Sequence, residues 1–246
     1  MPRTAALPRR TEPPKLPFNR ASPGGRIHTH QHLSVFKSVT SAVKFLLLIL
    51  LVDSTVVFEH NPNSVATREF KFKKIASPSK DDAAARAKLT LIDGDLDGGS
   101  AGLSALTDGR LPRDEDEPAA NVFFRAGSSG GRFRMDFKAP IEIAQVNTYS
   151  WHSNSRGPQL YKLYAADGSD PKFNPDPKRG VDPASCGWKF IALVSTLSDR
   201  GEDGGQYAAS VTDLGKHRYL LFDCYVTELY DNWGNTFYSE IDVIRG

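Results

Sequence analysis

The decapeptide Ile141-Glu-Ile-Ala-Gln-Val-Asn-Thr-Tyr-Ser150 decides the fold of this chain. Ile141 and Ile143 alternate with polar residues, and Val146 and Thr148 resume the alternation one place out of phase. Successive side chains of a strand point to opposite faces, so the pattern predicts a strand with one buried face. The change of phase near Ala144–Gln145 predicts a register shift of the kind that a β-bulge makes.

Similar runs recur from Glu69 to the C-terminus, separated by Gly, Pro, Asn and Asp. This spacing is typical of an all-β sandwich or barrel. Only residues 81–88, DDAAARAK, favour a short helix, because Ala, Arg and Lys have high helix propensity and acids lead the first turn. No linker after Lys80 divides the chain, so we expect a single domain over residues 69–246. The runs that predict strands are 70–75, 89–92, 121–125, 132–137, 141–150, 160–165, 189–196, 207–211, 218–227 and 236–244.

The N-terminal part of the chain has a different composition. Residues 1–36 form a basic, Pro-containing region that we expect to be disordered. The run Phe45–Val52, FLLLILLV, follows Lys37 and Lys44 and has the length and flanks of the apolar core of a signal peptide. It is much shorter than the roughly 20 apolar residues that span a bilayer. We therefore assign residues 37–58 to a signal peptide, with an uncleaved signal anchor as the alternative.

A signal peptide implies a cleavage site and a location outside the cytoplasm. Small residues suited to cleavage lie at Val52 with Ser54, or at Ser64 with Ala66, and the sequence does not choose between them. Residues 59–68 are expected to be a linker. The protein should be secreted or held in the cell envelope or periplasm.

The net charge of +2 conceals an uneven distribution. Residues 1–52 hold eight of the 31 Lys and Arg but one of the 29 acids, so the remaining chain carries 23 basic and 28 acidic residues. A mildly acidic body without a basic stripe interleaved with aromatic residues does not suit a phosphate backbone. We therefore expect no nucleic-acid partner.

Two acidic segments are the first candidates for chemistry. Residues 93–98, DGDLDG, match the first half of an EF-hand loop, but the twelfth position is Ser104 rather than Glu and no helices flank it. A solvated turn is the favoured interpretation, and another calcium geometry stays open. Residues 114–117, DEDE, offer paired carboxylates, but nothing nearby suggests the apolar pocket that would raise one pKa for acid catalysis. A charged surface loop is the favoured interpretation there.

Motifs for nucleophilic, metal-dependent or phosphate chemistry do not occur in the sequence. It contains no HExxH, Walker loop or CxxC, and its GxSxG matches at 98–102 and 127–131 do not form a nucleophile elbow between a predicted strand and a predicted helix. We therefore expect no enzyme, although a site built on loops needs no motif. Cys186 and Cys224 are the two cysteines, too few for a zinc site. In an exported chain they could form one disulfide, provided that their Cα atoms come within about 7 Å.

A series of short segments follows in this order: Leu106-Thr-Asp-Gly-Arg110, Val146-Asn-Thr-Tyr-Ser-Trp151, Arg156, Gln159-Leu-Tyr-Lys-Leu-Tyr164 and Asn235-Thr-Phe-Tyr-Ser-Glu-Ile-Asp-Val243. This ordered series resembles the discoidin, or factor V/VIII C-type, family of galactose-binding-like modules. The resemblance covers the chain from about Ile75 to the C-terminus. It implies an eight-stranded jelly-roll β-sandwich, which agrees with the all-β prediction made from the strand pattern.

The resemblance also implies a structural Ca²⁺. The matching residues are Asp108 and Glu240 as side-chain ligands, with backbone carbonyls of Ala105 and Ser239 completing an oxygen shell. Such an ion would tie the two ends of the domain together. The alternative is that Asp108 caps a turn and Glu240 is a solvated strand residue.

Ligand binding in this family belongs to loops at one end of the sandwich, where aromatic rings and fixed polar groups hold a sugar. The matching candidates are Trp151, His152, Asn154 and Arg156 in one loop and Asn232, Trp233 and Asn235 in another. Trp151 could instead belong to the core, and Arg156 could be structural. No pair of large apolar residues at a loop tip is evident, so we expect membrane contact only through an uncleaved signal anchor.

These expectations lead to two hypotheses about function. The first is an exported, non-catalytic module that binds carbohydrate, either a glycan or a cell-surface polysaccharide. The second is a protein-interaction or scaffold domain with calcium as a structural ion only. Exposed Trp151 and Trp233 in one concavity would favour the first, and a flat apolar patch of several hundred Å² the second. Converging ionisable groups with perturbed pKa values in a pocket would indicate an enzyme.

Overall fold

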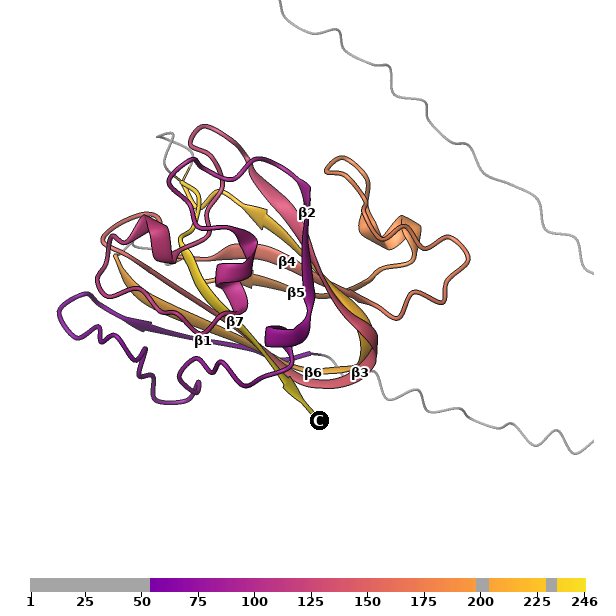
Figure 1. Cartoon of the computed structure of the whole chain (residues 1–246), viewed down its shortest axis with the longest axis horizontal. Helices are drawn as coiled ribbons and strands as arrows, with labels where there is room; N and C mark the ends of the chain where they lie inside the picture. Colours follow the sequence, from indigo (N-terminus) through magenta and orange to yellow (C-terminus); the bar gives the residue numbers. More distant parts are fainter. Residues whose placement is uncertain (1–53, 198–203, 229–233) are drawn as a thin grey trace, which may run out of the picture. The chain divides into compact units, whose positions relative to one another are not determined.

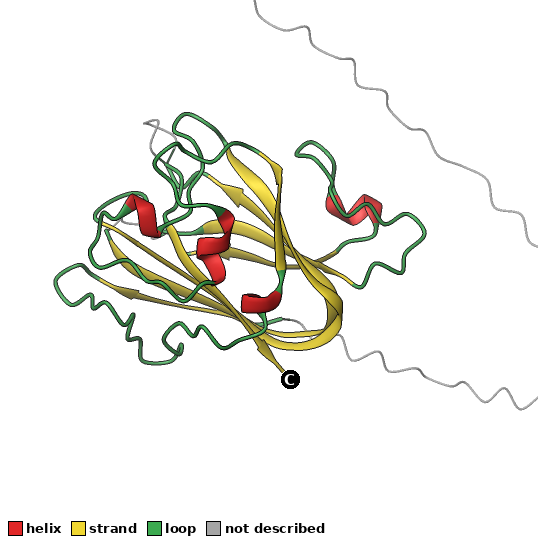
Figure 2. Ribbon diagram, in the orientation of Figure 1, coloured by secondary structure: helices red, strands yellow, loops and turns green. Residues whose placement is uncertain are grey.

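Antiparallel strands make up most of the computed structural model, which describes residues 54–197, 204–228 and 234–246. The disordered region predicted at 1–36 and the apolar run at 45–52 lie outside these residues. The strands are β1 (Val56–Asn61), β2 (Lys88–Asp93), β3 (Gly130–His152), β4 (Leu160–Ala166), β5 (Lys189–Ser195), β6 (Gly205–Tyr225) and β7 (Tyr238–Arg245). Four short 3-10 helices accompany them: η1 (Ala84–Arg86), η2 (Leu103–Thr107), η3 (Pro118–Ala120) and η4 (Pro183–Cys186). The prediction of an all-β fold is confirmed (Figure 2).

Two long strands, β3 and β6, each contribute to both layers of a sandwich. Residues 130–136 of β3 pair with 219–225 of β6, and residues 141–152 pair with 205–217. The first stretch belongs to the layer β2-β3-β6-β4-β5, and the second to the layer β7-β3-β6-β1. The two strands bend together between these stretches (Figure 1). The predicted register shift is confirmed, because the pairing of β3 shifts between Ile143 and Gln145.

The main core lies between the two layers. Phe133 of β3 and Phe222 of β6 stack with ring centroids 4.9 Å apart in the first layer. Val146 of β3 and Ile241 of β7, both fully buried, face them from the second layer. Burial of large apolar side chains stabilises a domain by about 1.5 to 3 kcal/mol each, so this interlayer core is the main source of stability.

A long segment covers the outer face of the layer that contains β7 and β1. This segment, residues 62–80, is called the strap. Its Phe70 and Ile75 are buried against Tyr149 and Trp151 of β3. Glu59 of β1 fixes the strap, because its carboxylate accepts hydrogen bonds from the backbone N–H groups of Lys73, Lys74 and Ile75 at 3.1, 2.7 and 2.8 Å.

A second covering segment lies over the outer face of the other layer. Residues 167–188 bring Trp188 against Tyr219 of β6. Arg132 of β3 holds this segment through hydrogen bonds to the carbonyls of Pro177 and Val181, and it forms a buried ion pair with Asp223 at 2.9 Å. Both outer faces of the sandwich are thus partly buried. The alternation of apolar and polar residues had predicted strands with only one buried face.

Several predicted elements are corrected by the structure. The predicted linker at 59–68 is wrong, because residues 56–61 form β1 and pair with β6. The predicted strand at 70–75 is irregular and belongs to the strap, and the run at 121–125 makes only isolated bridges. The helix predicted at 81–88 is reduced to one 3-10 turn, η1. Tertiary hydrogen bonds outweigh its local propensity, since Ala83 N donates to Val243 O and the Asp82 carboxylate accepts from Val243 N.

The search for membrane-spanning helices gives a negative result. None of the helices within 54–197, 204–228 and 234–246 has the length and apolar character needed to cross a bilayer.

Candidate ligand-binding site

Loops from three parts of the chain meet at one end of the sandwich, after the last residue of β3. Phe237 N donates to Arg156 O at 2.9 Å, and Thr227 Oγ1 donates to Ser155 O at 2.7 Å. Asn235 Nδ2 donates to Arg125 O at 3.0 Å. These bonds join the loop between β3 and β4 to the segments before β3 and before β7, so the structure gathers the described ones among the predicted loop residues at one place.

Arg156 is the centre of this loop cluster. Its guanidinium carbon lies 4.1 Å from the ring centroid of Phe237 and 4.6 Å from that of Phe123, and the two rings stack at 4.1 Å. Its Nε donates to Asn235 O at 3.2 Å. Cation–π contacts of a desolvated guanidinium stabilise by about 2 kcal/mol. Arg156, 7 % exposed, therefore holds the loops together, which is the structural role that the sequence left open for it.

His152 is buried beside the same aromatic pair. Its ring meets Phe237 edge-on at 4.6 Å, and its Nδ1 accepts a hydrogen bond from Asn154 N at 3.1 Å. Burial, together with the positive charge of Arg156, lowers the pKa of His152 to about 4. The Asp116 carboxylate, 3.8 Å from Nε2, opposes this shift but does not offset it. At neutral pH the imidazole is therefore uncharged, and the site offers hydrogen bonds rather than a titrating cation.

The two predicted asparagines that can be placed have different environments. Asn235 is 1 % exposed, and besides Arg125 O its Nδ2 reaches Ser128 Oγ at 3.3 Å. Asn154 is exposed, and Asp116 and Arg125 lie exposed on the neighbouring loops. Asn232 and Trp233 fall outside the described residues. Buried residues thus build the platform, and Asn154 is the predicted contact residue that the described part of the site presents to solvent.

The expectation of an exposed indole at Trp151 is wrong. Trp151 is 6 % exposed and packs edge-on against Phe70 of the strap at 5.7 Å. Its Nε1 donates to Asn63 Oδ1 at 2.9 Å. Because the strap covers this face of the sheet, the last strand residue before the loop becomes part of the core.

Sequence reasoning missed two residues of the platform, Phe123 and Phe237. Phe123 lies in the run 121–125, which was assigned to a strand, and Phe237 in the closing segment 236–244. The two residues lie far apart in the sequence, so nothing in either segment indicated that their rings would stack on each other. The pair is recognisable only from the tertiary contact with Arg156.

The predicted calcium residues also come close together. Glu240 of β7 is fully buried, and its Oε2 accepts a hydrogen bond from Gly109 N at 3.1 Å. Its Oε1 is buried without a hydrogen-bond partner. Burial, followed by the charge of Asp242, raises the pKa of Glu240 to about 9, and Asp108 adds to the shift. Glu240 is therefore not the solvated strand residue that the alternative required.

The surroundings of Glu240 suit a cation in part. Asp108 is exposed at the end of η2, and its Oδ1 accepts from Arg110 N at 2.8 Å. The residues described include no group of three or more His, Cys, Asp or Glu that could hold a metal. The calcium shell expected here has only two carboxylates, completed by two backbone carbonyls. The observation that fits an ion is the buried Oε1 of Glu240, which has no hydrogen-bond partner.

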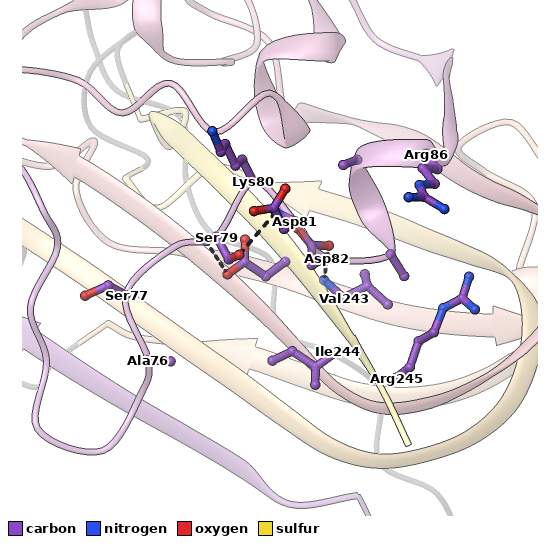
Figure 3. Close-up of a pocket in the computed structure, with 13 residues that line it drawn as sticks. Ala76, Ser77, Ser79, Lys80, Asp81, Asp82, Arg86, Val243, Ile244 and Arg245 are labelled. Carbon is purple, nitrogen blue, oxygen red and sulfur yellow. Dashed lines mark hydrogen bonds between the residues drawn. The ribbon is translucent and has the colours of Figure 1, made fainter.

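A cavity of about 540 Å³ lies between residues 76–86 and the end of β7 (Figure 3). Asp82 and Asp242 line it, and Lys80, Arg86 and Arg245 stand at its edges. Burial, and then the charge of Asp82, raises the pKa of Asp242 to about 7. One oxygen of Asp242 accepts from Ser79 N at 3.0 Å, and one oxygen of Asp82 accepts from Val243 N at 2.8 Å. The two carboxylates thus fasten this part of the chain to β7.

The disulfide between Cys186 and Cys224 does not form in this structure, where both thiols are free. Cys224 points into the interlayer core beside Phe222, whereas Cys186 packs with the Trp188 cluster on the outer face of the same sheet. Side chains on opposite faces of a sheet cannot bring their Cβ atoms together without breaking the strand pairing.

Comparison with known proteins gives matches among solved structures alone. No protein-family model and no curated protein matches the chain. The chain is similar in structure to carbohydrate-binding modules and lectin domains.

Three of these solved structures illustrate the likeness. The lectin domain of lectinolysin complexed with Lewis B antigen is 11 % identical, with a TM-score of 0.43, and the match covers 69 % of this chain and 99 % of that one. The family 32 carbohydrate-binding module of C. perfringens NanJ, in complex with galactose, is 9 % identical at a TM-score of 0.40, with 65 % and 95 % covered. A GH31 CBM32-2 module bound to GalNAc is 12 % identical at a TM-score of 0.41, with 65 % and 97 % covered. At these identities the likeness concerns the fold alone.

Proposed function

We propose that the domain is a carbohydrate-binding module that binds glycan without cleaving it, at the loop cluster around Arg156. The observation that carries this proposal is the platform of Arg156, Phe123 and Phe237, which fixes a loop that displays Asn154 to solvent. A rigid scaffold under exposed polar groups is the arrangement by which binding loops reduce the entropy lost on association.

The charge state of the site supports a neutral, hydroxyl-rich ligand. His152 is uncharged at neutral pH, and the positive charge of Arg156 lies against two aromatic rings. The exposed Asn154 amide both donates and accepts hydrogen bonds, as sugar hydroxyls require. The proposed ligand is therefore a neutral glycan or a neutral segment of a cell-surface polysaccharide.

A glycan-array screen of the full chain tests this function. We expect selective, saturable binding, and we expect Asn154→Ala to weaken it roughly tenfold, since one lost hydrogen bond changes affinity by about that factor. The Asn154 side chain is exposed, so folding should not change. Lys172→Ala, an exposed change on the covering segment of the other layer, serves as the control. A blank array from the folded chain, or equal loss in both variants, would contradict the proposal.

A protein-interaction domain is the second candidate, and β5 is the observation that favours it. Among the described residues, β4 is the one strand that pairs with β5, and Phe190 and Leu193 on β5 are 48 % and 52 % exposed. A partly open strand edge with apolar side chains is suited to an added strand from a partner. If the folded chain binds no glycan on the array, this second function is favoured.

We also propose that calcium binds between Asp108 and Glu240, as a structural ion that accompanies either function. The buried, unpartnered Oε1 of Glu240 supports this, because an uncompensated buried carboxylate is costly. Asp108 would supply the second carboxylate, and the carbonyls of Ala105 and Ser239 would complete the shell. The ion would then join the η2 loop to the last strand.

For export, we propose cleavage near Val52–Ser54 rather than at Ser64–Ala66. Cleavage at the second position would remove β1, whose six residues pair with β6, and would remove Glu59 from the strap. The apolar run ends just before the first described residue, so cleavage there leaves the sheet complete. N-terminal sequencing of the exported protein should find a start close to residue 54, and a start after residue 64 would refute this.

A further inference from the structure

The strap carries a cluster of basic side chains that the proposed glycan site does not use. Residues 68–80 contain five Lys and Arg and one acid, Glu69. By contrast, residues 81–246 hold 18 Lys and Arg against 25 Asp and Glu. The strap is therefore a local positive region on a domain that is otherwise acidic. The basic residues are Arg68, Lys71, Lys73, Lys74 and Lys80.

The fold of the strap turns these side chains toward solvent. Phe70 is fully buried, and Phe72 is half-buried against Tyr149, whereas Lys71, Lys73 and Lys74 are exposed. The backbone that carries the lysines is held in place, because Lys71 O accepts from Asn61 Nδ2 at 2.9 Å. The N–H groups of Lys73 and Lys74 donate to Glu59. The cluster is thus fixed by backbone hydrogen bonds and aromatic anchors, which leaves its ammonium groups unused.

Ion pairs do not neutralise the cluster, although Lys80 shares a cavity with Asp81, Asp82 and Asp242. In the described part of the chain, none of its five cations forms an ion pair with a carboxylate. Glu59, the acid that holds the strap, has both carboxylate oxygens bonded to backbone N–H groups. Unpaired cations fixed on one surface attract a polyanion and release its counterions on binding.

We infer that the strap binds an acidic polysaccharide, with sulfate or carboxylate groups, at a surface separate from the loop site. Exposed lysines supply both charge and hydrogen-bond donors for such groups. A single-stranded nucleic acid would need aromatic faces for stacking, and the strap turns Phe70 and Phe72 into the sheet. A bilayer contact would need several exposed apolar side chains beside the lysines, whereas Phe70 and Ile75 are buried and Val65 is the exposed large apolar residue of the strap. This inference does not depend on the proposed neutral-glycan site.

Binding of heparin, a sulfated polysaccharide, to the full chain is the experiment that tests the inference. The triple variant Lys71→Gln, Lys73→Gln, Lys74→Gln removes three charges without touching the backbone bonds of the strap. Its affinity should fall roughly tenfold at physiological salt, and its salt dependence should become shallower, because fewer counterions are released. The matched control is Lys88→Gln, Lys172→Gln, Lys216→Gln, which removes the same charge at three scattered exposed sites. The control should lose at most about twofold, the effect of net charge alone.

Each other outcome would overturn the inference. The absence of heparin binding, or equal loss in both triple variants, would mean that the strap is only a solvated surface. Duplex DNA or vesicles of phosphatidylserine that bind as tightly as heparin, through the same three lysines, would replace the polysaccharide with another polyanion. Melting curves of both variants show whether the fold is retained. Asn154→Ala should keep full heparin affinity, so failure of this surface and failure of the loop site are distinguishable.

Discussion

In chelator, the wild-type domain should lose stability as the pH rises from about 5 to about 9. Glu240→Gln should remove most of this pH-dependent loss. Glu240 has a pKa raised from 4.5 to about 9 by burial and by Asp242. A carboxyl whose pKa is higher in the folded state binds its proton more tightly there than in the unfolded chain. Its contribution is complete below pH 4.5 and is lost as the pH rises through 9. A shift of this size corresponds to roughly 6 kcal/mol at most.

We expect a measured loss of about 2 to 3 kcal/mol in the wild type, because local relaxation admits water to the new charge. Urea unfolding at a series of pH values measures it. Asp242, with a pKa raised to about 7, should leave a smaller slope in the variant. Glu142→Gln, the same change at an exposed carboxyl of β3, should keep the wild-type profile. A Glu240→Gln profile that parallels the wild type would contradict the assignment of the pH effect to Glu240.

Adding calcium distinguishes an effect of protonation at Glu240 from an effect of metal binding. If calcium binds between Asp108 and Glu240, adding it at pH 8 should raise the melting temperature of the wild type. It should leave Glu240→Gln and Asp108→Ala unchanged, since each lacks one carboxylate ligand. Identical melting curves of the wild type in calcium and in chelator would remove the metal site, while the pH dependence would still stand.

Trp151→Ala should destabilise the domain by about 3 to 5 kcal/mol, the range for removing a large buried aromatic side chain. Trp151 contacts Phe70 of the strap and donates to Asn63, so the change opens a cavity beneath the strap and breaks one of its fastenings. Denaturant unfolding gives the loss directly. Trp151→Phe, which keeps most of the apolar volume but loses the indole N–H, should lose about 1 to 2 kcal/mol.

The contrast with a sugar-stacking role for Trp151 is sharp. A contact residue on the surface would leave stability unchanged when truncated and would abolish glycan binding. If Trp151→Ala has the stability of the wild type but no longer binds glycan, the indole is not buried beneath the strap.

Strand positions could be predicted where buried and solvent-facing side chains alternate along the sequence. The run at 141–150, with its register shift, is an example, since side-chain alternation directly reports which face is buried. The sequence did not show that 132–137 and 141–150 are one strand, or that 56–61 adds to the sheet. Those facts depend on pairing with β6, more than 50 residues away in each case.

The candidate site shows the same division. The resemblance directed attention to His152, Asn154, Arg156 and Asn235, and the structure brings these loops together. Which of them contact solvent could not be predicted, because exposure depends on Phe123, Phe237 and the strap, whose positions are set by long-range packing. The same applies to the cysteines, whose spacing allowed a bridge that the two faces of one sheet exclude.

The sequence by itself determined the all-β class, the charge asymmetry between the two ends of the chain and the segments that resemble galactose-binding-like modules. These properties follow from local alternation, composition and short motifs, which a linear reading captures in full. Tertiary structure alone decided that Trp151 is core, that Glu240 is a buried acid and that the five strap cations are exposed. The physical reason is that burial and charge compensation depend on which distant segments cover a residue, and that is settled only when the layers pack.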